Sequence, residues 1–401
     1  KNIDATDRNK MELFDNFFEV GESNFYNQNF SANYNLPISN FPFLDFIDAN
    51  YSYNGNFNWQ RGSDIQNNIN DEFGNKLGRV NTIQNSNNQT FNISLNLDKF
   101  YRQISFLNKN SIFSILKSVR RIRSTYSENS GKVLPGYIPS IGFLGTLKPS
   151  FGFVFGDQKD VRYEIAKNGW LTEFSNFNQQ YQKIYNSKFD LSAEIELFKN
   201  LRIDLNANRT YSNNYSENYS VVDKQYNSLN GNFYGNFSIS SNMLRTSFNT
   251  KSVDISDNFE NLKKIRLDIA NRLISNKNLN EINYDNDGFP IGYGKTSQAV
   301  IIPAFISAYT GIDVRKISLN PITDRPKLNW TLQYSGLEQF FDEIFSRVSL
   351  QHGYRSNFTI NNFNYNLNFQ ENGFDLSGNY LNKIIFSNVN LVEQFNPLIR
   401  I

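Results

Sequence analysis

The stretch FDLSAEIELFKNLRIDLNANR, residues 189–209, contains two runs in which apolar and polar residues alternate. Successive side chains of a β-strand point to opposite faces, so each run predicts a strand with one apolar and one polar face. The short link Phe198-Lys199-Asn200 between them predicts a hairpin. Each arm is about nine residues long, which suits a tilted strand that crosses the hydrocarbon layer of a bilayer. A soluble sandwich shows the same alternation, so the rest of the chain has to decide.

The alternation recurs along the chain. It is clearest at residues 30–36, 47–59, 91–97, 231–239, 328–334 and 363–369. Between these runs we predict a polar loop at 60–88. We also predict a looped or bulged segment at 131–156, which ends in the strand-like run Phe151, Phe153 and Phe155. Counting weaker segments, about ten to twelve strands fit, which is the coverage that an up-and-down barrel requires.

Composition favours a membrane barrel over other classes. Only 39% of the 401 residues are hydrophobic and the mean hydropathy is −0.54, yet aromatic residues reach 15%. Such a chain is too aromatic for disorder and low in aliphatic side chains for a globular core. No run approaches the roughly 18 apolar residues of a transmembrane helix. We therefore predict an all-β fold that forms an antiparallel transmembrane β-barrel wall, in which alternate residues face lipid and water.

The polar residues of these runs are mostly Asn, Ser and Gln, with few charges of one sign. A pore that selects ions needs a ring of like charges or a constriction. A wide, neutral, hydrated wall is typical of a passage for large cargo, or of a filled lumen. The pattern does not choose between those two.

Few residues offer catalytic or metal chemistry. The chain has no Cys and its only His is His352, for which we predict a structural hydrogen bond. Glu194 and Glu196 are interpreted as solvated residues of the polar face. Asp285 and Asp287 resemble part of a calcium loop, but the final Glu of such a loop is not matched. Without such residues we expect no enzyme activity and no cofactor. Because the 40 basic and 38 acidic residues are spread throughout the chain, we also expect no nucleic-acid partner.

One interval breaks the strand period. Apolar residues recur at helical spacing between Phe259 and Leu273, and a second short helix is predicted from Pro303 to just before Gly311. We therefore predict a structured, partly helical loop insertion at 256–325, while residues 1–401 as a whole form one segment of a barrel wall. In a barrel, such an insertion caps a rim or enters the lumen, so it is a candidate gate.

Several blocks resemble the giant SprA/Sov translocon family of the Bacteroidota type IX secretion system. They are EFGNKLGRVNT (72–82), LPGYIPSIGFLG (134–145), FGFVFGDQKDVR (151–162), NGWLT (168–172), DGFPIGYGKTSQAVIIPAFISAYTG (287–311), PKLNWTLQYSGLEQ (326–339), HGYRS (352–356) and EQFNPLI (393–399). The blocks keep the family's order and cover most of the chain, although the stretch 107–119 is shorter than the family implies. Because the chain opens with KNIDATDRNK, without a Met start or signal core, we expect a piece of a longer, processed chain.

The resemblance singles out a set of motif positions, which are also the candidate rim or gate residues. They are Leu134, Pro135, Gly136, Tyr137, Pro139, Gly145, Phe155, Gly156, Gln158, Gly169, Trp170, Leu171, Gly288, Tyr293, Pro303, Phe305, Tyr309, Gly311, Trp330, Tyr334, Gly336, His352 and Tyr354.

The resemblance also implies a fold and a function. It implies one very large single-chain barrel in the outer membrane of a Gram-negative bacterium, of which this chain supplies about a third. Folded cargo proteins with a C-terminal secretion signal would leave through a lateral opening in the wall, and in gliding species this export supports gliding motility. The implied partners are a PorV-like shuttle barrel, a periplasmic plug protein, the cargo, the remaining barrel segments and the lipid bilayer.

Two alternatives stay open. A TonB-dependent, SusC-like nutrient receptor is also a large aromatic-rich barrel, and it would carry an N-terminal plug domain and a TonB box. A secreted β-rich surface adhesin without a channel would pack two sheets against each other, hide its aromatic face and remain soluble without detergent.

Overall fold

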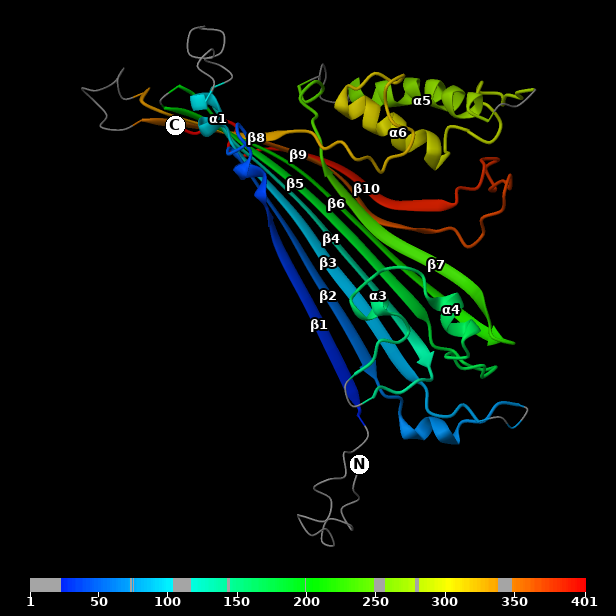
Figure 1. The fold of residues 1–401 in the computed structure, drawn as a ribbon. Helices are drawn as coiled ribbons and strands as arrows, with labels where there is room; N and C mark the ends of the chain where they lie inside the picture. The colour runs from blue at the N-terminus through cyan, green and yellow to red at the C-terminus, as the bar shows by residue number, and fades with distance from the viewer. Residues whose placement is uncertain are drawn as a thin grey trace.

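A computed structural model describes residues 23–401 of the protein except 73, 75, 104–116, 143–144, 199, 249–256, 278–280 and 338–347. Most of the predicted short stretch 107–119 lies outside these described residues. The described part is built on one antiparallel sheet of ten strands, which confirms the prediction of an all-β antiparallel fold (Figure 1).

The strands are long. In chain order they are β1 (Phe25–Leu36), β2 (Ile47–Gln60), β3 (Asn81–Asn96), β4 (Val119–Tyr137), β5 (Tyr181–Phe198), β6 (Leu201–Val222), β7 (Gln225–Ser240), β8 (Asn329–Ser335), β9 (Ser349–Tyr365) and β10 (Ile384–Phe395). The helices are α1 (Leu97–Gln103), α3 (Phe151–Val154), α4 (Arg162–Lys167), α5 (Asp257–Ser275) and α6 (Gln298–Thr310), with 3₁₀ turns η2 (Pro37–Asn40) and η3 (Asp64–Asn68).

The sheet is a meander with open edges. Strands β1 to β7 pair in sequence order, followed by β9 and β10. Within the described residues, β1 pairs only with β2 and β10 pairs only with β9, so the sheet does not close on itself. The predicted hairpin of β5 and β6 is present, but its strands have 18 and 22 residues, because the alternation continues with Tyr, Asn and Ser beyond the aliphatic part.

The insertion leaves and re-enters the sheet at one point. Strands β7 and β8 both pair with β6, β7 along residues 209–222 and β8 along 201–206, so they occupy one strand position end to end. Where the insertion 241–328 interrupts them, the Lys327 N–H donates to the Ser240 carbonyl at 2.9 Å. The Asn329 side chain and the Ser356 backbone exchange two further bonds, at 3.2 and 2.9 Å. These contacts carry the strand pairing across the interruption.

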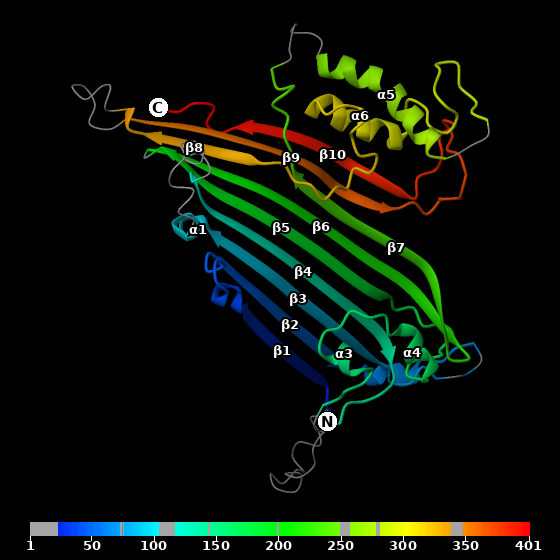
Figure 2. The same ribbon diagram turned by 45° about the horizontal axis from the view of Figure 1, so that its top comes forward.

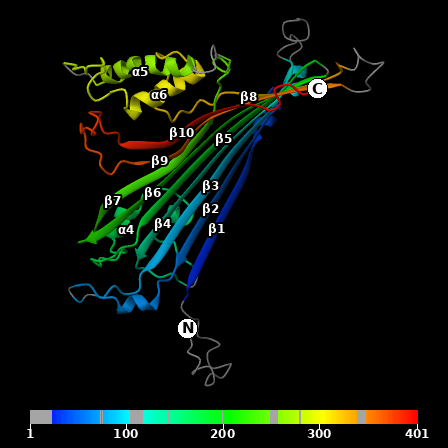
Figure 3. The same ribbon diagram turned by 180° about the vertical axis from the view of Figure 1, so that it is seen from behind.

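All described α-helices except the terminal α1 lie on one side of the sheet, which we call the helix-bearing face (Figures 1 and 2). Tyr215 of β6 packs in the cluster that includes α4, and Tyr211 of the same face packs in the cluster that includes α6. The opposite side, the polar face, carries no helix (Figure 3). The insertion therefore covers the apolar side of β7, β9 and β10, where α6 buries Ile302 and Ala304.

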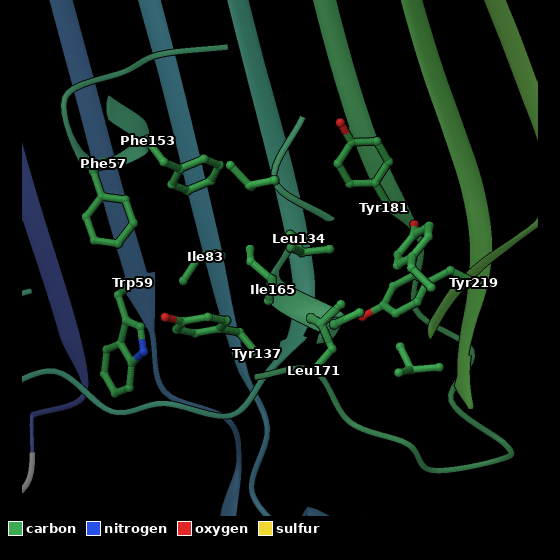
Figure 4. Close-up of a cluster of buried hydrophobic side chains, with 14 of the residues drawn as sticks. Phe57, Trp59, Ile83, Leu134, Tyr137, Phe153, Ile165, Leu171, Tyr181 and Tyr219 are labelled. Carbon is green, nitrogen blue, oxygen red and sulfur yellow. The ribbon is translucent and has the colours of Figure 1, made fainter. Parts of the chain in front are cut away.

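The segment 138–180 forms the largest described core with the sheet (Figure 4). Phe57, Trp59 and Ile83 from the strands meet Phe153 of α3 and Ile165 of α4, and all five are at most 2% exposed. Ser150 caps α3 by accepting a hydrogen bond from the Phe153 N–H at 3.2 Å. The prediction of a strand over Phe151–Phe155 was therefore wrong, because this N-cap starts a helical turn and the aromatic residues pack onto the sheet.

The prediction of a loop at 60–88 was also wrong in part, since β3 begins at Asn81. Its polar residues are buried because they bond the segment 138–180. The Asn85 amide donates to the Phe153 and Asp157 carbonyls at 3.2 and 2.7 Å, and the Asn87 amide donates to the Gly156 carbonyl at 2.8 Å. The Asn85 amide is fully satisfied, since its oxygen also accepts from Gln158 at 3.3 Å, whereas the buried Asn87 oxygen has no hydrogen-bond partner in the described structure.

Other boundaries differ from the predictions for local reasons. Helix α6 begins at Gln298 and contains Pro303, but it ends as predicted at Gly311, whose φ of 66° gives a left-handed cap. Residues 131–137 belong to β4 rather than to a loop. Strand β9 ends at Tyr365, so the predicted strand at 363–369 is the end of a longer strand that starts at Ser349.

The segment 138–180 approaches the sheet most closely at Gly55. An ideal Cβ there would lie 2.2 Å from the Phe155 carbonyl oxygen. We predict that Gly55→Ala displaces this segment at a cost of about 1–3 kcal/mol and raises tryptic cleavage at the exposed Lys159 and Lys167 by roughly 10- to 100-fold. Gly131→Ala is the matched control, because its Cβ would come no closer than 3.4 Å to another atom. Equal cleavage of both variants would contradict this docking.

Candidate functional site: a two-faced wall

Aromatic side chains form a row across the helix-bearing face. Cross-strand pairing places one from each of five adjacent strands directly opposite the next, and these are Tyr34, Tyr51, Phe91, Tyr126 and Phe189. The row is accessible, with Tyr34 58% and Tyr126 40% exposed. In β6 the row continues with Arg209, whose guanidinium bonds the Thr323 carbonyl of the insertion at 2.9 Å. We call these five residues the aromatic row.

On one side of the aromatic row lies an uncharged area that we call the apolar belt. It contains two consecutive cross-strand rows and their extension on β5 and β6, namely Ala49, Ile93, Ser124, Leu191 and Ala207, then Ile47, Leu95, Ile122, Ala193 and Leu205, then Ile195 and Ile203. Apart from the two small residues Ala49 and Ala207, these side chains are only half-buried. None belongs to the described hydrophobic clusters with α3 to α6.

On the other side of the aromatic row the same face turns polar. The next pairing positions hold Gln89, Glu128 and Ser187, and further rows hold Asn87, Ser130 and then Lys132, Lys183. This is the part of the sheet that the segment 138–180 covers. On β3 and β4 the helix-bearing face therefore changes from aliphatic to aromatic to polar, and then to the buried apolar residues Ile83 and Leu134 under segment 138–180.

The polar face is hydrophilic at the height of the apolar belt. The side chains directly behind the belt include Asp48, Ser94, Arg123, Ser192 and Asn206 in one row. Another row contains Arg121, Glu194 and Asp204. Amide and hydroxyl groups bond across strands, as in the 2.9 Å contact from Thr125 Oγ1 to Asn92 Oδ1. The two sides of the same strands thus differ in polarity at this height.

A buried charge cluster fastens α4 to the sheet. The Arg162 guanidinium bonds both oxygens of Asp160, at 2.9 and 2.6 Å, and also bonds the Glu217 carboxylate of β6. Glu217 is 1% exposed and accepts hydrogen bonds of 2.6 Å from the Tyr215 and Tyr226 hydroxyls. Burial alone raises the pKa of Asp160, but the hydrogen bonds and charge of Arg162 outweigh it and lower that pKa below its usual value.

The structure distributes the motif positions over three places on the helix-bearing face. Those between Leu134 and Leu171 come together in and around the core of segment 138–180, where Leu134, Tyr137 and Leu171 are at most 2% exposed. Those between Gly288 and Gly311 lie in the insertion. Those between Trp330 and Tyr354 lie on β8 and β9 or directly after β8, and the rings of Trp330 and Tyr354 stack at 4.4 Å. The three groups do not form one site.

Several motif glycines and prolines have a visible structural role. Gly136 has φ of 79° and faces the Tyr219 hydroxyl, while Gly156 has φ of 93° and lies against Gly55. The Pro139 carbonyl accepts hydrogen bonds from the Trp59 indole at 3.1 Å and the Asn81 amide at 3.2 Å. These residues shape the docking of segment 138–180, where backbone and sheet are in contact.

The remaining candidate residues have structural partners. His352 Nδ1 lies 2.6 Å from the Leu398 carbonyl, as the predicted structural hydrogen bond requires. Asp285 accepts the N–H groups of Asp287 and Phe289 in a tight turn, and Asp287 pairs with Lys295 at 2.7 Å. In the described part of the chain, no three His, Cys, Asp or Glu side chains could hold a metal ion together.

Two features of the site were not predicted from the sequence, the aromatic row and the ion pair between Arg162 and Glu217. The aromatic row was not predicted, because it depends on which residues of neighbouring strands lie opposite each other. The pair of Arg162 and Glu217 joins residues 55 positions apart. The only local signal for it was a charged residue at an apolar-face position of β6.

Comparison with models of known protein families and with curated proteins gave no match. Across the described residues, no helix combines the length and the hydrophobicity needed to cross a membrane.

The charge cluster makes a stability prediction. Glu217→Gln leaves Arg162 without one of its two carboxylates and removes the acceptor charge for three hydroxyls, those of Tyr215, Tyr226 and Ser228. We expect the docking of α4 to weaken by about 3 kcal/mol and hydrogen exchange of the Ile165 and Asn168 amides to accelerate roughly 100-fold. The control is Glu194→Gln, because Glu194 makes only an exposed ion pair with Arg202 at 3.5 Å. Unchanged exchange in the Glu217 variant would contradict the role of the cluster.

Proposed function

We propose that this chain is part of the wall of a large outer-membrane β-barrel that conducts folded proteins, a translocon of the SprA/Sov kind in a type IX secretion system. The observation that carries the proposal is the aromatic row, which separates the apolar belt from polar rows on β3, β4 and β5 of one face, while the opposite face behind the belt is polar. In gliding species such export also supports gliding motility.

The apolar belt supports a lipid-facing position. In transmembrane barrels, the apolar band that faces lipid is bordered by aromatic residues at the membrane interface. The alternate residues of the same strands face the lumen and are polar. The belt is uncharged, half-exposed and uncovered by the described helices, whereas the side chains behind it are charged or amide-bearing. In water, an exposed belt of this kind would favour aggregation.

The strand lengths support a barrel that extends beyond the bilayer. A membrane-crossing strand needs about 9–11 residues, whereas β5 has 18 and β6 has 22. The part beyond the aromatic row ends in the connections 61–80, 138–180 and 366–383, which we call the loop-rich end. Outer-membrane barrels have their longer loops on the extracellular side, so we assign the loop-rich end to the cell exterior.

The open edges support a wall larger than the described sheet. Soluble proteins protect edge strands with Lys, Pro or bulges. The edge strands here, FYNQNFSANYNL in β1 and IIFSNVNLVEQF in β10, contain no Lys or Pro. In the described structure β1 has no strand partner on its outer side, and on the outer side of β10 only Ile384 and Phe386 are bonded, by the Gln298 side chain. Backbone groups in a bilayer cannot stay unpaired. Further strands of a large barrel would satisfy both edges.

The polar face suits passage of folded cargo. Its amides and hydroxyls hydrate a wide lumen, and the mixed charge signs give no strong field that would retain one kind of surface. Export of this kind needs no catalytic residue. Because a hole of such size would leak, the lumen has to be sealed. The insertion 241–328 and the segment 138–180 pack on the helix-bearing face, so we propose that they act at the rim or at a lateral opening of the wall and not inside the lumen. A PorV-like shuttle barrel and a periplasmic plug protein are the partners that we propose for sealing it.

The orientation of the belt can be tested with two neighbouring residues of β6. Leu205 lies in the apolar belt, and Asn206 lies on the polar face opposite Ser192 and Asn329. We expect Leu205→Arg to cost about 2–4 kcal/mol because it places a charge in lipid, and to deplete folded protein from the outer-membrane fraction. Asn206→Arg should assemble like the unmodified protein. If both variants assemble equally well, the belt does not face lipid.

The transport function can be tested by photo-crosslinking during export. A photoreactive amino acid at Asn88, on the polar face, should capture cargo protein, whereas the same group at Ile93, in the apolar belt, should capture lipid and no cargo. Both positions lie on β3, so expression and strand register are matched. Cargo adducts from Ile93, or none from Asn88 while export proceeds, would contradict the proposal.

The same experiment separates the alternatives. A nutrient receptor would take up a small ligand in an energy-dependent way and give no protein adducts at Asn88. An adhesin would be recovered without detergent and would hide the aromatic row in a second sheet. In the described residues there is one sheet, and the aromatic row is exposed.

A further inference from the structure

A cavity of about 380 Å³ opens on the helix-bearing face where segment 138–180 meets the strands. It lies between β4, β5, β6 and the chain just before α4. Its lining consists of Lys132, Gln158, Asp160, Arg162, Tyr181, Lys183, Tyr185, Asn213 and Tyr215. The volume falls within the range of about 300–1,000 Å³ that is usual for small-ligand sites.

The lining holds three cations, Lys132, Arg162 and Lys183, against one carboxylate, Asp160, which pairs with Arg162. Lys132 and Lys183 are directly opposite each other on β4 and β5, an arrangement of like charges that destabilises a sheet. Lys132 is 4% exposed and donates to the backbone carbonyls of Gln158 and Lys159, which do not neutralise it. Lys183 is exposed, and no described residue forms an ion pair with it. Arg162, the third cation, is already paired with Asp160 and Glu217. An anion bound between the two lysines would remove the repulsion.

The uncharged lining residues favour a ligand that carries hydroxyl groups in addition to a negative charge. The side-chain oxygens of Gln158 and Asn213 are buried and have no hydrogen-bond partner in the described structure. Tyr181, Tyr185 and Tyr215 supply aromatic rings, whose electron-rich faces attract polarised C–H groups. Inorganic phosphate would leave the amide oxygens and rings unused, and a neutral sugar would leave the lysine pair uncompensated. A phosphorylated sugar satisfies all three kinds of group.

We propose that this cavity binds the phosphorylated sugar headgroup of an outer-leaflet glycolipid. The choice of a lipid rests on the proposed membrane position, because Tyr185 lies on β5 four residues beyond Phe189 of the aromatic row, about 14 Å along the strand. For a strand tilted by about 40°, this is roughly 10 Å beyond the interface, at the level of a sugar headgroup and above a phospholipid phosphate. The cavity opens toward the side that the apolar belt presents to lipid.

The test compares two variants of β5 in the full-length protein purified in detergent. Lys183→Gln removes the exposed cation of the cavity, and Lys188→Gln removes an exposed lysine that pairs with Asp190 on the polar face of the same strand. The probes are lipid A, which carries phosphorylated glucosamine, soluble glucosamine 1-phosphate and inorganic phosphate. Binding is measured by native mass spectrometry and by titration calorimetry.

We expect lipid A and glucosamine 1-phosphate to bind, and Lys183→Gln to weaken both by about tenfold while Lys188→Gln changes neither. Inorganic phosphate should bind at least tenfold more weakly than the sugar phosphate. Equal binding by both variants and the unmodified protein, or equal binding of inorganic phosphate and sugar phosphate, would overturn the proposal. Binding of the soluble sugar phosphate that is as tight as that of lipid A would overturn the assignment to a lipid.

The outcome is independent of the transport assay. Glucosamine 1-phosphate needs no bilayer, so a pocket for sugar phosphates would still be detected if the protein proved not to be a translocon. Conversely, cargo adducts at the polar face together with an empty cavity would leave the proposed function standing and remove only the glycolipid site.

Discussion

Strand register is the constraint on which the rest of the structure depends. Most of the ten strands are longer than 12 residues, and alternate residues of each strand lie on the same side of the sheet. A shift of the pairing by one residue would therefore exchange the two faces of a strand. Only in the observed register do five aromatic residues line up and does the apolar belt stay free of charge. The insertion respects this constraint, because Ser240 and Lys327 close the gap between β7 and β8 with a backbone hydrogen bond.

Beyond the apolar belt, hydrogen bonds from polar side chains help to hold segment 138–180 against the sheet. Asn85 and Asn87 of β3 and Lys132 of β4 are buried, and each donates to backbone carbonyls of segment 138–180. Irregular backbone that packs on a sheet has carbonyls without strand partners, which must be satisfied. The same residues that hold this segment therefore also leave a cationic cavity beside it, since Lys132 is neutralised by none of its carbonyl partners.

The sequence predicted those elements in which hydrophobicity carries the pattern. The hairpin of β5 and β6, most of β2 and the two helices of the insertion follow from apolar spacing. The first half of β3 was missed because NTIQNSNN has almost no apolar residue, and its burial depends on amide contacts with a segment about 70 positions away. Phe151, Phe153 and Phe155 imitate a strand, and only the Ser150 cap and the tertiary packing make them helical. The side of the sheet on which the insertion lies could not be predicted, because it depends on contacts between α6 and three strands.

The three candidate functions make different demands on the helix-bearing face. An adhesin needs that face covered, since water is its only solvent, yet segment 138–180 and the insertion leave the aromatic row and the apolar belt free between them. A barrel of either kind needs the belt uncovered and both sheet edges continued by further strands. We propose a translocon rather than a receptor because the polar face is broad, amide-rich and of mixed charge, so that it would keep a folded protein hydrated without attracting one sign of charge.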